Sequence, residues 1–263
     1  MVGDGPAAPV GLPDLRGTVA VVTGAGGGIG AGVARQFSAA GAAVVLHYRT
    51  SRDRCAALAE ELVAAGGQAV TAPGDTTDPE QCIALMQAAV DAYGRLDAVV
   101  NNAGVQPSEA LEDLTVERWR AVVDTNLTGT FAATQAAVAV MRHSGGGSVT
   151  HIASTEGSHP ARAHAHYCAS KAAVIMHART AALEYGGWGV RVNTVSPGLV
   201  DRDGLAAVWP DGVQRWRAKA PLRRLGSSTD IGNACVFLAS PMAAWITGHD
   251  LVVDGGMSAS PTW

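Results

Sequence analysis

Lysine and aromatic residues are scarce in this chain. Only two of its 19 basic residues are lysines, and Phe, Trp and Tyr together make up 5% of the 263 positions. The cysteines show no C-x-x-C spacing, so the sequence indicates neither a zinc site nor a disulfide framework. It predicts reduced thiols in a cytoplasmic protein. The four cysteines are Cys55, Cys82, Cys168 and Cys235.

The sequence also lacks a long apolar run and a basic cluster. No stretch reaches the length of a membrane-spanning helix, and the N-terminus has none of the regions of a signal peptide. The net charge of -4 argues against nucleic acid or an anionic membrane as the main partner, so we expect a small-molecule ligand. Residues 1–14, rich in Gly, Pro and Ala, are predicted to form a flexible arm before a single domain over residues 15–263.

Hydrophobic residues make up 48% of the chain and form short β-branched runs that alternate with longer helical stretches. Apolar strands separated by helices are typical of a parallel sheet covered on both faces. The sequence therefore predicts an α/β fold, a single Rossmann-like, doubly wound domain with a seven-stranded parallel sheet and helices on both faces. The expected strands cover residues 18–23, 43–47, 68–72, 97–100, 148–153, 190–195 and 250–253. The expected helices cover residues 29–40, 52–65, 79–93, 116–142, 165–186 and 228–239.

A glycine-rich turn, T-G-A-G-G-G-I-G over residues 23–30, lies between the first expected strand and the first expected helix. Glycines in this position let backbone N–H groups approach a pyrophosphate at a helix N-terminus. The alternative is a flexible turn without a ligand, because glycine-rich turns are common. The strand before the turn and the helix after it favour phosphate binding.

The end of the second expected strand bears on the choice of cofactor. A site selective for NAD usually has an acidic residue here, whereas the 2'-phosphate of NADP needs a cation. This chain has Tyr48 at that position, followed by Arg49 and Thr50. Because a guanidinium flanked by hydroxyl groups suits a phosphate, we predict NADP(H) rather than NAD(H). An ordinary solvated loop would leave the preference open.

Tyr167 and Lys171 lie four residues apart in the expected helix 165–186 and therefore share one face of it. A nearby cation favours the phenolate, so we predict that the pKa of Tyr167 lies below its ordinary value of about 10 and that this residue transfers a proton. Arginine holds its proton too firmly to replace the lysine. A Tyr-x-x-x-Lys spacing also arises by chance, so it does not decide the function alone.

Several motifs occur in a fixed order along the chain. They are Thr23, Gly24, Gly28 and Gly30 in the glycine turn, Asp75 and Thr76 after the third strand, N-N-A-G at residues 101–104, Asn126 in D-T-N-L, Ser154 before Tyr167 and Lys171, and Pro197 and Gly198 after the sixth strand. In this order and at these spacings they resemble the short-chain dehydrogenase/reductase family, with the match running over residues 15–258.

This resemblance implies an NAD(P)-dependent oxidoreductase that acts on CH–OH or C=O groups by hydride transfer. It implies that Tyr167 donates the proton, Ser154 hydrogen-bonds the carbonyl oxygen, Lys171 holds the nicotinamide ribose and Asn126 anchors a relay water. The positions that it implies for cofactor binding are Gly24, Gly26, Gly28, Ile29, Gly30, Arg49, Thr50, Asp75, Thr76, Asn102, Ala103, Gly104, Tyr167, Lys171, Pro197, Gly198 and Val200.

One position departs from the family pattern. Arg202 stands where the family often has a threonine that helps to hold the nicotinamide carboxamide, which leaves the shape of the pocket above the nicotinamide open. His164 and His166 point apart on a helix and no acid or cysteine completes a ligand set, so we expect no metal site. Glu156 is expected to be structural or to contact a polar substrate group.

The segment at about 199–226 is expected to be the flap that closes over the substrate. Trp209 and Trp216 within it suit either stacking on a flat ring or anchoring of the flap. Its W-P-D-G-V-x-R-W arrangement resembles bacterial ketoreductases that tailor aromatic, angucycline-type polyketides in antibiotic biosynthesis. We therefore expect an NADPH-dependent ketoreductase that acts on a ketone of a cyclic or aromatic polyketide.

Other functions stay open at this point. Within the family they are a 3-oxoacyl-thioester reductase and a sugar or secondary-alcohol dehydrogenase, and outside catalysis a nucleotide-sensing binding protein. The resemblance also implies a homotetramer or homodimer, formed through helices 116–142 and 165–186 and the last strands. Trp245 and Trp263 would suit a buried interface near the C-terminus.

Overall fold

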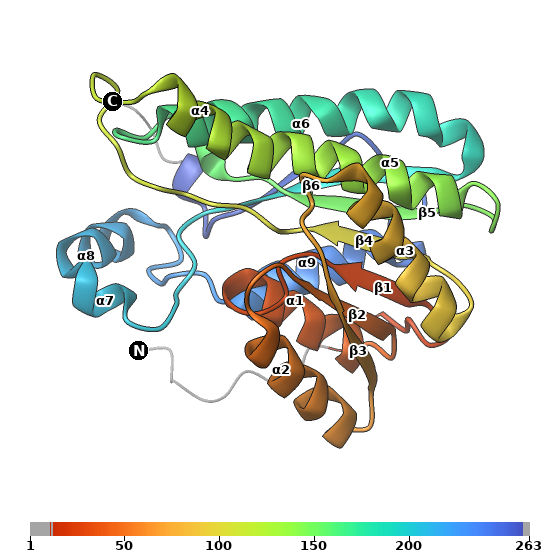
Figure 1. Cartoon of the computed structure of the whole chain (residues 1–263). Coiled ribbons are helices and arrows are strands. Elements are labelled where there is room, and N and C mark those ends of the chain that lie inside the picture. Colours follow the sequence, from red (N-terminus) through yellow and green to blue (C-terminus); the bar gives the residue numbers. More distant parts are fainter. Residues whose placement is uncertain (1–10, 12, 260–263) are drawn as a thin grey trace.

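The computed structural model describes residues 11 and 13–259, and within them seven strands form one sheet (Figure 1). All strand pairs are parallel, in the order β3-β2-β1-β4-β5-β6-β7. The strands are β1 (Val19–Val22), β2 (Ala43–Tyr48), β3 (Gln68–Pro73), β4 (Ala98–Asn101), β5 (Gly147–Ile152), β6 (Val190–Pro197) and β7 (Asp250–Val253). The predicted α/β fold with a seven-stranded parallel sheet is confirmed.

Helices cover both faces of this sheet. The α-helices are α1 (Gly28–Ala39), α2 (Arg52–Ala64), α3 (Pro79–Tyr93), α4 (Val116–Val123), α5 (Gly129–Met141), α6 (Ala165–Tyr185), α7 (Leu205–Val208), α8 (Pro210–Lys219) and α9 (Ser228–Ala239). A π-helical turn, η1 (Asp124–Thr128), joins α4 to α5. Short 3-10 turns are η2 (Thr155–Gly157), η3 (Gly186–Trp188), η4 (Pro241–Ala243) and η5 (Met257–Ala259). No helix in the described part of the chain is long and apolar enough to cross a membrane.

The central strands are apolar on both sides because each side meets a layer of helices. On β1, Ala20 and Val22 pack against α1, α2 and α9, whereas Val19 and Val21 pack against α3, α5 and α6. All four side chains are buried. Alternate residues of a strand point to opposite faces, so an uninterrupted V-A-V-V run serves both cores at once.

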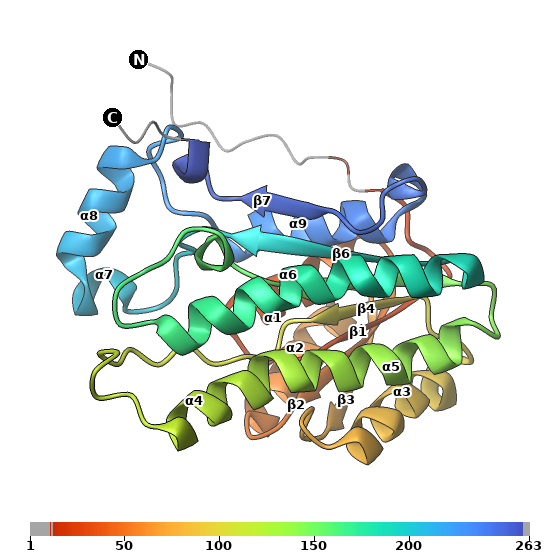
Figure 2. The same cartoon turned by 90° about the horizontal axis from the view of Figure 1, so that it is seen from above.

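Two predicted elements differ from the structure. The single helix expected over 116–142 is interrupted by the π turn η1, whose wider winding has no hydrophobic period by which sequence could predict it. The flap expected at 199–226 contains two helices, α7 and α8, which lie beyond the carboxyl ends of the strands (Figures 1 and 2). Most of the predicted flexible arm, and Trp263, lie outside the described residues.

The strand order fixes where a ligand can bind. The chain runs outward from β1 through β2 to β3, and then returns to β4 on the other side of β1. The loops that leave β1 and β4 therefore diverge at the carboxyl ends of two adjacent strands. Such a switch point leaves a crevice in which open parallel sheets bind ligands.

Candidate active site

The turn between β1 and α1 has room only for glycine at several positions. Gly24 has a φ of +64°, in the left-handed region, and a Cβ built on Gly30 would lie 2.4 Å from the carbonyl oxygen of Gly24. A Cβ on Gly26 would lie 2.2 Å from the Ser51 Oγ. Glycine is required here because the backbone itself is the closely packed surface.

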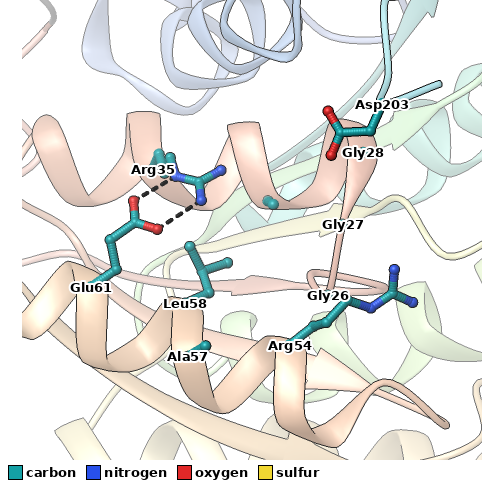
Figure 3. Close-up of a pocket in the computed structure, with 10 residues that line it drawn as sticks. Gly26, Gly27, Gly28, Arg35, Arg54, Ala57, Leu58, Glu61 and Asp203 are labelled. Carbon is teal, nitrogen blue, oxygen red and sulfur yellow. Dashed lines mark hydrogen bonds and ion pairs between the residues drawn. The ribbon is translucent and has the colours of Figure 1, made fainter. Parts of the chain in front are cut away.

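The first turn of α1 carries the groups that an anion needs. Its N-cap is Gly27, so no side chain caps the helix, and the first turn holds no acidic residue. The free N–H groups of this turn, with Gly28 and Ile29 at its start, and the positive end of the helix dipole suit a pyrophosphate. A cavity of about 350 Å³ lies at this turn (Figure 3). Its lining residues are Gly26, Gly27, Gly28, Ala31, Arg35, Arg54, Ala57, Leu58, Glu61 and Asp203.

The loop after β4 is fastened to the glycine turn. The Thr23 Oγ1 accepts hydrogen bonds from the backbone N–H groups of Asn102 and Ala103, both at 2.9 Å. The Asn102 side chain donates to the carbonyl oxygens of Thr23 and Gly24 at 2.9 and 3.2 Å. The predicted residues of these two loops therefore form one surface, and Gly104 continues it toward Asn126.

A residue not predicted from sequence, His47 on β2, supports the same turn. Its Nδ1 accepts a hydrogen bond from the Gly24 N–H at 3.1 Å, so its Nε2 carries the proton and donates to the Gly74 carbonyl oxygen at 3.0 Å. Burial lowers the pKa of His47, in agreement with this neutral tautomer. Its position at the end of the second expected strand was the only signal available in the sequence.

The predicted 2'-phosphate residues, Arg49 and Thr50, follow β2 and are not among the residues that line the cavity. The Arg49 guanidinium is 3.4 Å from the Asp75 carboxylate, and both side chains are partly exposed. The Thr77 backbone N–H donates a hydrogen bond to Asp75 and helps to hold its pKa below the ordinary value. Thr50 is exposed beside Arg49, whereas Thr76 is buried beside Asp75.

Arg54 was not singled out from sequence, yet its guanidinium lies close to the glycine turn. It reaches from α2 so that its Nη1 would lie 3.5 Å from a Cβ built on Gly27 (Figure 3). The other arginine of the cavity, Arg35, is paired through two hydrogen bonds with Glu61. The signal for Arg54 was the run R-T-S-R-D-R, whose last arginine lies in the first turn of α2.

Tyr167 and Lys171 share one face of α6, as the spacing predicted. The Lys171 Nζ lies 5.6 Å from the centre of the Tyr167 ring and donates a hydrogen bond to the Ile152 carbonyl oxygen at 2.6 Å. Lys171 is buried, and Ser154 is buried at the carboxyl end of β5. The three side chains thus converge from β5 and α6 beside the loop that follows β4.

The predicted direction of the Tyr167 pKa is wrong. Burial raises the pKa of Tyr167 to about 12, with hydrogen bonding to Ser154 opposing the shift and the charge of Glu156 adding to it. Burial also lowers the pKa of Lys171 to about 8. The ammonium faces the ring and the Ile152 carbonyl, so desolvation of the phenolate outweighs its attraction.

Asn126 lies in η1 and is fully buried. Its Oδ1 accepts from the Val105 N–H at 2.8 Å, and its Nδ2 donates to the Val105 carbonyl oxygen and to the Ser170 Oγ. A Cβ on Gly104 would lie 3.1 Å from the Asn126 Oδ1 and 3.7 Å from the Lys171 Nζ. Asn126 therefore joins the loop after β4 to α6 next to Lys171.

The end of β6 closes the site on the side of the flap. Gly198 has no space for a side chain, because a Cβ would lie 2.7 Å from Trp216. Pro197 accepts a hydrogen bond from the Thr155 hydroxyl, and Val200 pairs with Gly226 at the base of the flap. Arg202, the departure from the family pattern, is exposed.

The two flap tryptophans differ in their surroundings. Trp216 packs with Leu199, Leu205, Val213 and Leu225, so it anchors the flap to its own base. Trp209 is 47% exposed, and the Arg215 guanidinium lies 6.0 Å from its ring centre.

The histidines near Tyr167 do not come together. His164 pairs with Glu156 at 2.9 Å, whereas His166 is buried and its Nδ1 accepts from the Tyr167 N–H. Within residues 11 and 13–259 no three His, Cys, Asp or Glu side chains form a group that could hold a metal ion.

Comparison with known proteins agrees with this arrangement. A family described as "Enoyl-(Acyl carrier protein) reductase" matches residues 24–258. A 2,5-dichloro-2,5-cyclohexadiene-1,4-diol dehydrogenase, LinX, of Sphingobium indicum is 38% identical over 244 residues, covering 93% of this chain and 97% of that protein. An uncharacterized oxidoreductase of Methylorubrum extorquens is 39% identical over 250 residues, covering 94% of this chain and all of its own length.

Two solved structures have the same fold. A putative short-chain alcohol dehydrogenase from Sinorhizobium meliloti has a TM-score of 0.90 at 36% identity, covering 94% of this chain and 99% of that one. A 7α-hydroxysteroid dehydrogenase complexed with NADH and 7-oxo glycochenodeoxycholic acid has a TM-score of 0.88 at 34% identity, covering 92% and 95%. The chain therefore belongs to the short-chain dehydrogenase/reductase family and is an NAD(P)-dependent oxidoreductase acting on alcohol and carbonyl groups.

Proposed function

We propose that the protein is an NADPH-dependent ketoreductase that reduces a ketone held on a ring. The observation that carries this proposal is the convergence of Ser154, Tyr167 and Lys171 beside an uncapped, glycine-lined helix start. Bound at that turn, NADPH supplies the hydride that reaches the carbonyl carbon.

The side chains around Tyr167 supply the proton and stabilise charge. Tyr167 donates its hydroxyl proton to the carbonyl oxygen as the alcohol forms, and its high pKa keeps it protonated beforehand. Ser154 hydrogen-bonds the same oxygen as negative charge develops. Lys171 holds the ribose and stabilises the phenolate that remains, while Asn126 positions the loop beside it and anchors the water that returns a proton.

The preference for NADPH rests on two arginines. Arg49 directly follows Tyr48, the last residue of β2 and the position where an acid would select NAD, and Arg54 faces the glycine turn. The contact of Arg49 with Asp75 is long and exposed, so little is lost when the guanidinium turns to a phosphate. Asp75 and Thr76 are then free to contact the adenine. The other residues proposed to surround the cofactor are Gly24, Gly26, Gly28, Ile29, Gly30, Thr50, Asn102, Ala103, Gly104, Pro197, Gly198 and Val200.

We expect Arg49→Ala and Arg54→Ala each to weaken NADPH binding about 10- to 100-fold, because each removes a charge-assisted hydrogen bond. NADH binding should change little, since NADH lacks the 2'-phosphate. Titration calorimetry with both nucleotides measures the effect, and Arg179→Ala on α6 serves as the control. Tighter binding of NADH than NADPH by the unaltered protein would refute the preference.

Features of the flap and the names of similar proteins both support a cyclic substrate. Trp209 joins α7 to α8, the two helices that lie beyond the carboxyl ends of the strands (Figure 2), and its side chain is partly exposed. The names of two similar proteins contain ring compounds. One is a dehydrogenase of a dichloro-cyclohexadiene-diol, and the other was solved in complex with 7-oxo glycochenodeoxycholic acid. The sequence resemblance of the flap narrows the proposed ring to an aromatic polyketide, such as a polycyclic quinone made in antibiotic biosynthesis.

A screen of NADPH oxidation separates this substrate from the alternatives. We expect turnover of a polycyclic quinone ketone and little turnover of an acetoacetyl thioester or glucose. Activity on the thioester alone would instead assign a 3-oxoacyl-thioester reductase, for which the exposed Arg223 is the candidate cation, because Arg224 is paired with Asp230. Tight NADPH binding without turnover of any carbonyl compound would indicate a nucleotide-sensing protein. The four free cysteines further support the proposed cytoplasmic location.

A further inference from the structure

Glu156 occupies a position next to the proposed proton donor that the reaction itself does not explain. It lies in η2, two residues after Ser154, and its backbone N–H donates to the Ser154 Oγ at 3.1 Å. Side chains from two other parts of the chain form hydrogen bonds with its carboxylate. The Gln106 Nε2 lies 3.1 Å from Oε1, and the His164 Nδ1 lies 2.9 Å from Oε2.

The pair formed by Glu156 and His164 borders Tyr167 directly. The His164 ring, at the start of α6, meets the Tyr167 ring edge to face, with 6.1 Å between ring centres. The Cys168 thiol is 3.7 Å from the Glu156 Oε2 on the same side. Glu156 is thus held by groups from the loop after β4 and from α6, the two segments that also position Asn126 and Lys171.

The carboxylate keeps capacity to bind a further donor. It offers about four acceptor sites. Gln106 and His164 use two of them and the weak thiol contact a third, which leaves Oε1 able to accept again. The side chains of Glu156 and His164 are 22% and 20% exposed, so the pair can be reached by a ligand but is shielded from bulk water.

We propose that Glu156, oriented by His164 and Gln106, is a substrate-binding residue that accepts a hydrogen bond from a hydroxyl group next to the ketone that reacts. The substrate class is then a hydroxyketone, or a diol in the reverse direction. This inference rests on the proposed function, because it assigns a second polar contact within the same site. A site built to bind a substrate hydroxyl discriminates against the analogue that lacks it.

The first experiment compares two bicyclic ketones that differ by one hydroxyl, α-tetralone and its α-hydroxy derivative. For the unaltered enzyme we expect kcat/KM with NADPH to favour the hydroxyketone about tenfold or more. In Glu156→Gln this preference should fall about tenfold, because a charged acceptor becomes a neutral one. Glu60→Gln, an exposed carboxylate on α2, is the matched control and should keep the preference.

The second experiment tests the role of His164. His164→Ala should lose the preference, and His164→Asn should restore part of it by returning a hydrogen-bond donor. If His164 only stabilised the loop, both variants would lower activity on the two ketones equally. Thermal unfolding and NADPH affinity of each variant show whether the fold is intact.

A third measurement needs no cofactor. Tyr167 is faced by Ser154 and Glu156 from η2 and by His164, Cys168 and Lys171 from α6 and its cap. Removing the Glu156 charge in Glu156→Gln should lower the pKa of Tyr167, followed as tyrosinate absorbance with Tyr167→Phe as the blank. An unchanged pKa would show that the carboxylate does not act at Tyr167 and would overturn the assigned geometry.

The outcomes separate this inference from the function on which it rests. Reduction of both ketones with equal kcat/KM, or a preference that survives in Glu156→Gln, overturns the role of Glu156 and leaves the ketoreductase assignment intact. If neither ketone nor any compound of the carbonyl screen is reduced, the ketoreductase function fails, and the assignment of a hydroxyketone fails with it.

Discussion

The proposed proton donor and its neighbouring lysine both have pKa values shifted toward their neutral forms. The pKa of Tyr167 is raised to about 12 and that of Lys171 lowered to about 8, in each case mainly by burial. A site that disfavours both charges keeps the phenol protonated, which is the form required to reduce a ketone. The spacing of the two residues was predictable from sequence, whereas the direction of the tyrosine shift depends on burial.

We expect Tyr167→Phe to bind NADPH as the unaltered protein does and to lose turnover by a factor of about 10² to 10⁴, because only the donated proton is removed. Nucleotide titration and steady-state reduction of a ring ketone measure the two effects. Tyr93→Phe, a tyrosine on α3, is the matched control. Full activity of Tyr167→Phe would rule out the proposed proton donor.

The buried lysine makes stability depend on pH. Below pH 8 the folded protein must hold a buried charge, and between pH 8 and 10.5 the unfolded chain binds more protons than the folded one, so stability rises with pH. In Lys171→Met this rise should be missing. Between pH 8 and pH 10.5, the unfolding free energy of the unaltered protein should therefore rise by up to ~3 kcal/mol relative to that of Lys171→Met. Urea unfolding of both proteins at each pH measures this difference. A difference independent of pH would contradict the lowered pKa.

At the scale of elements, the glycine turn and the π turn position the site in different ways. The glycine turn is set by residues adjacent in sequence, since a Cβ on Gly30 would meet the Gly24 carbonyl. The π turn η1 places Asn126 against Val105 and Ser170, residues from two other segments. The glycine motif therefore located the first element from the sequence, whereas no sequence pattern located the second.

We expect Gly30→Ala to lower stability by about 1–3 kcal/mol and to abolish measurable NADPH affinity, because the added methyl group forces the turn apart. Gly186→Ala is the matched control. Gly186 has a helical φ of -56° and an added Cβ would meet nothing within 4 Å, so this substitution should be neutral or slightly stabilising. Equal effects of the two substitutions would show that the turn tolerates a side chain.

At the scale of the whole molecule, one face of the helical layer carries several exposed hydrophobic side chains. It is formed by α4, α5 and α6, which lie along one side of the sheet (Figure 2). Exposed hydrophobic residues on these helices are Val116, Trp119, Phe131, Met176 and Leu183. We propose that this face is buried between subunits of a homotetramer or homodimer. Trp245, fully exposed near the last strand, suits a second contact.

Light scattering after size exclusion tests this assembly. The unaltered protein should have the mass of two or four chains, and Phe131→Glu should shift it toward a monomer, since a charge cannot be buried in an apolar interface. Ile83→Glu, an exposed residue on α3, is the control and should leave the assembly unchanged. A monomeric unaltered protein would refute the proposed interface.

The sequence by itself determined the order of strands and helices, the parallel sheet, the glycine turn and the shared helical face of Tyr167 and Lys171. These features depend on patterns among residues that are close together in sequence. In such patterns the spacing of the residues decides the type of element and the face on which each side chain lies. The tertiary structure alone decided the roles of His47 and Arg54, the π turn at Asn126, the pairing of Glu156 with His164 and the raised pKa of Tyr167. Each of these depends on burial and on contacts between segments far apart in sequence, which no local pattern encodes.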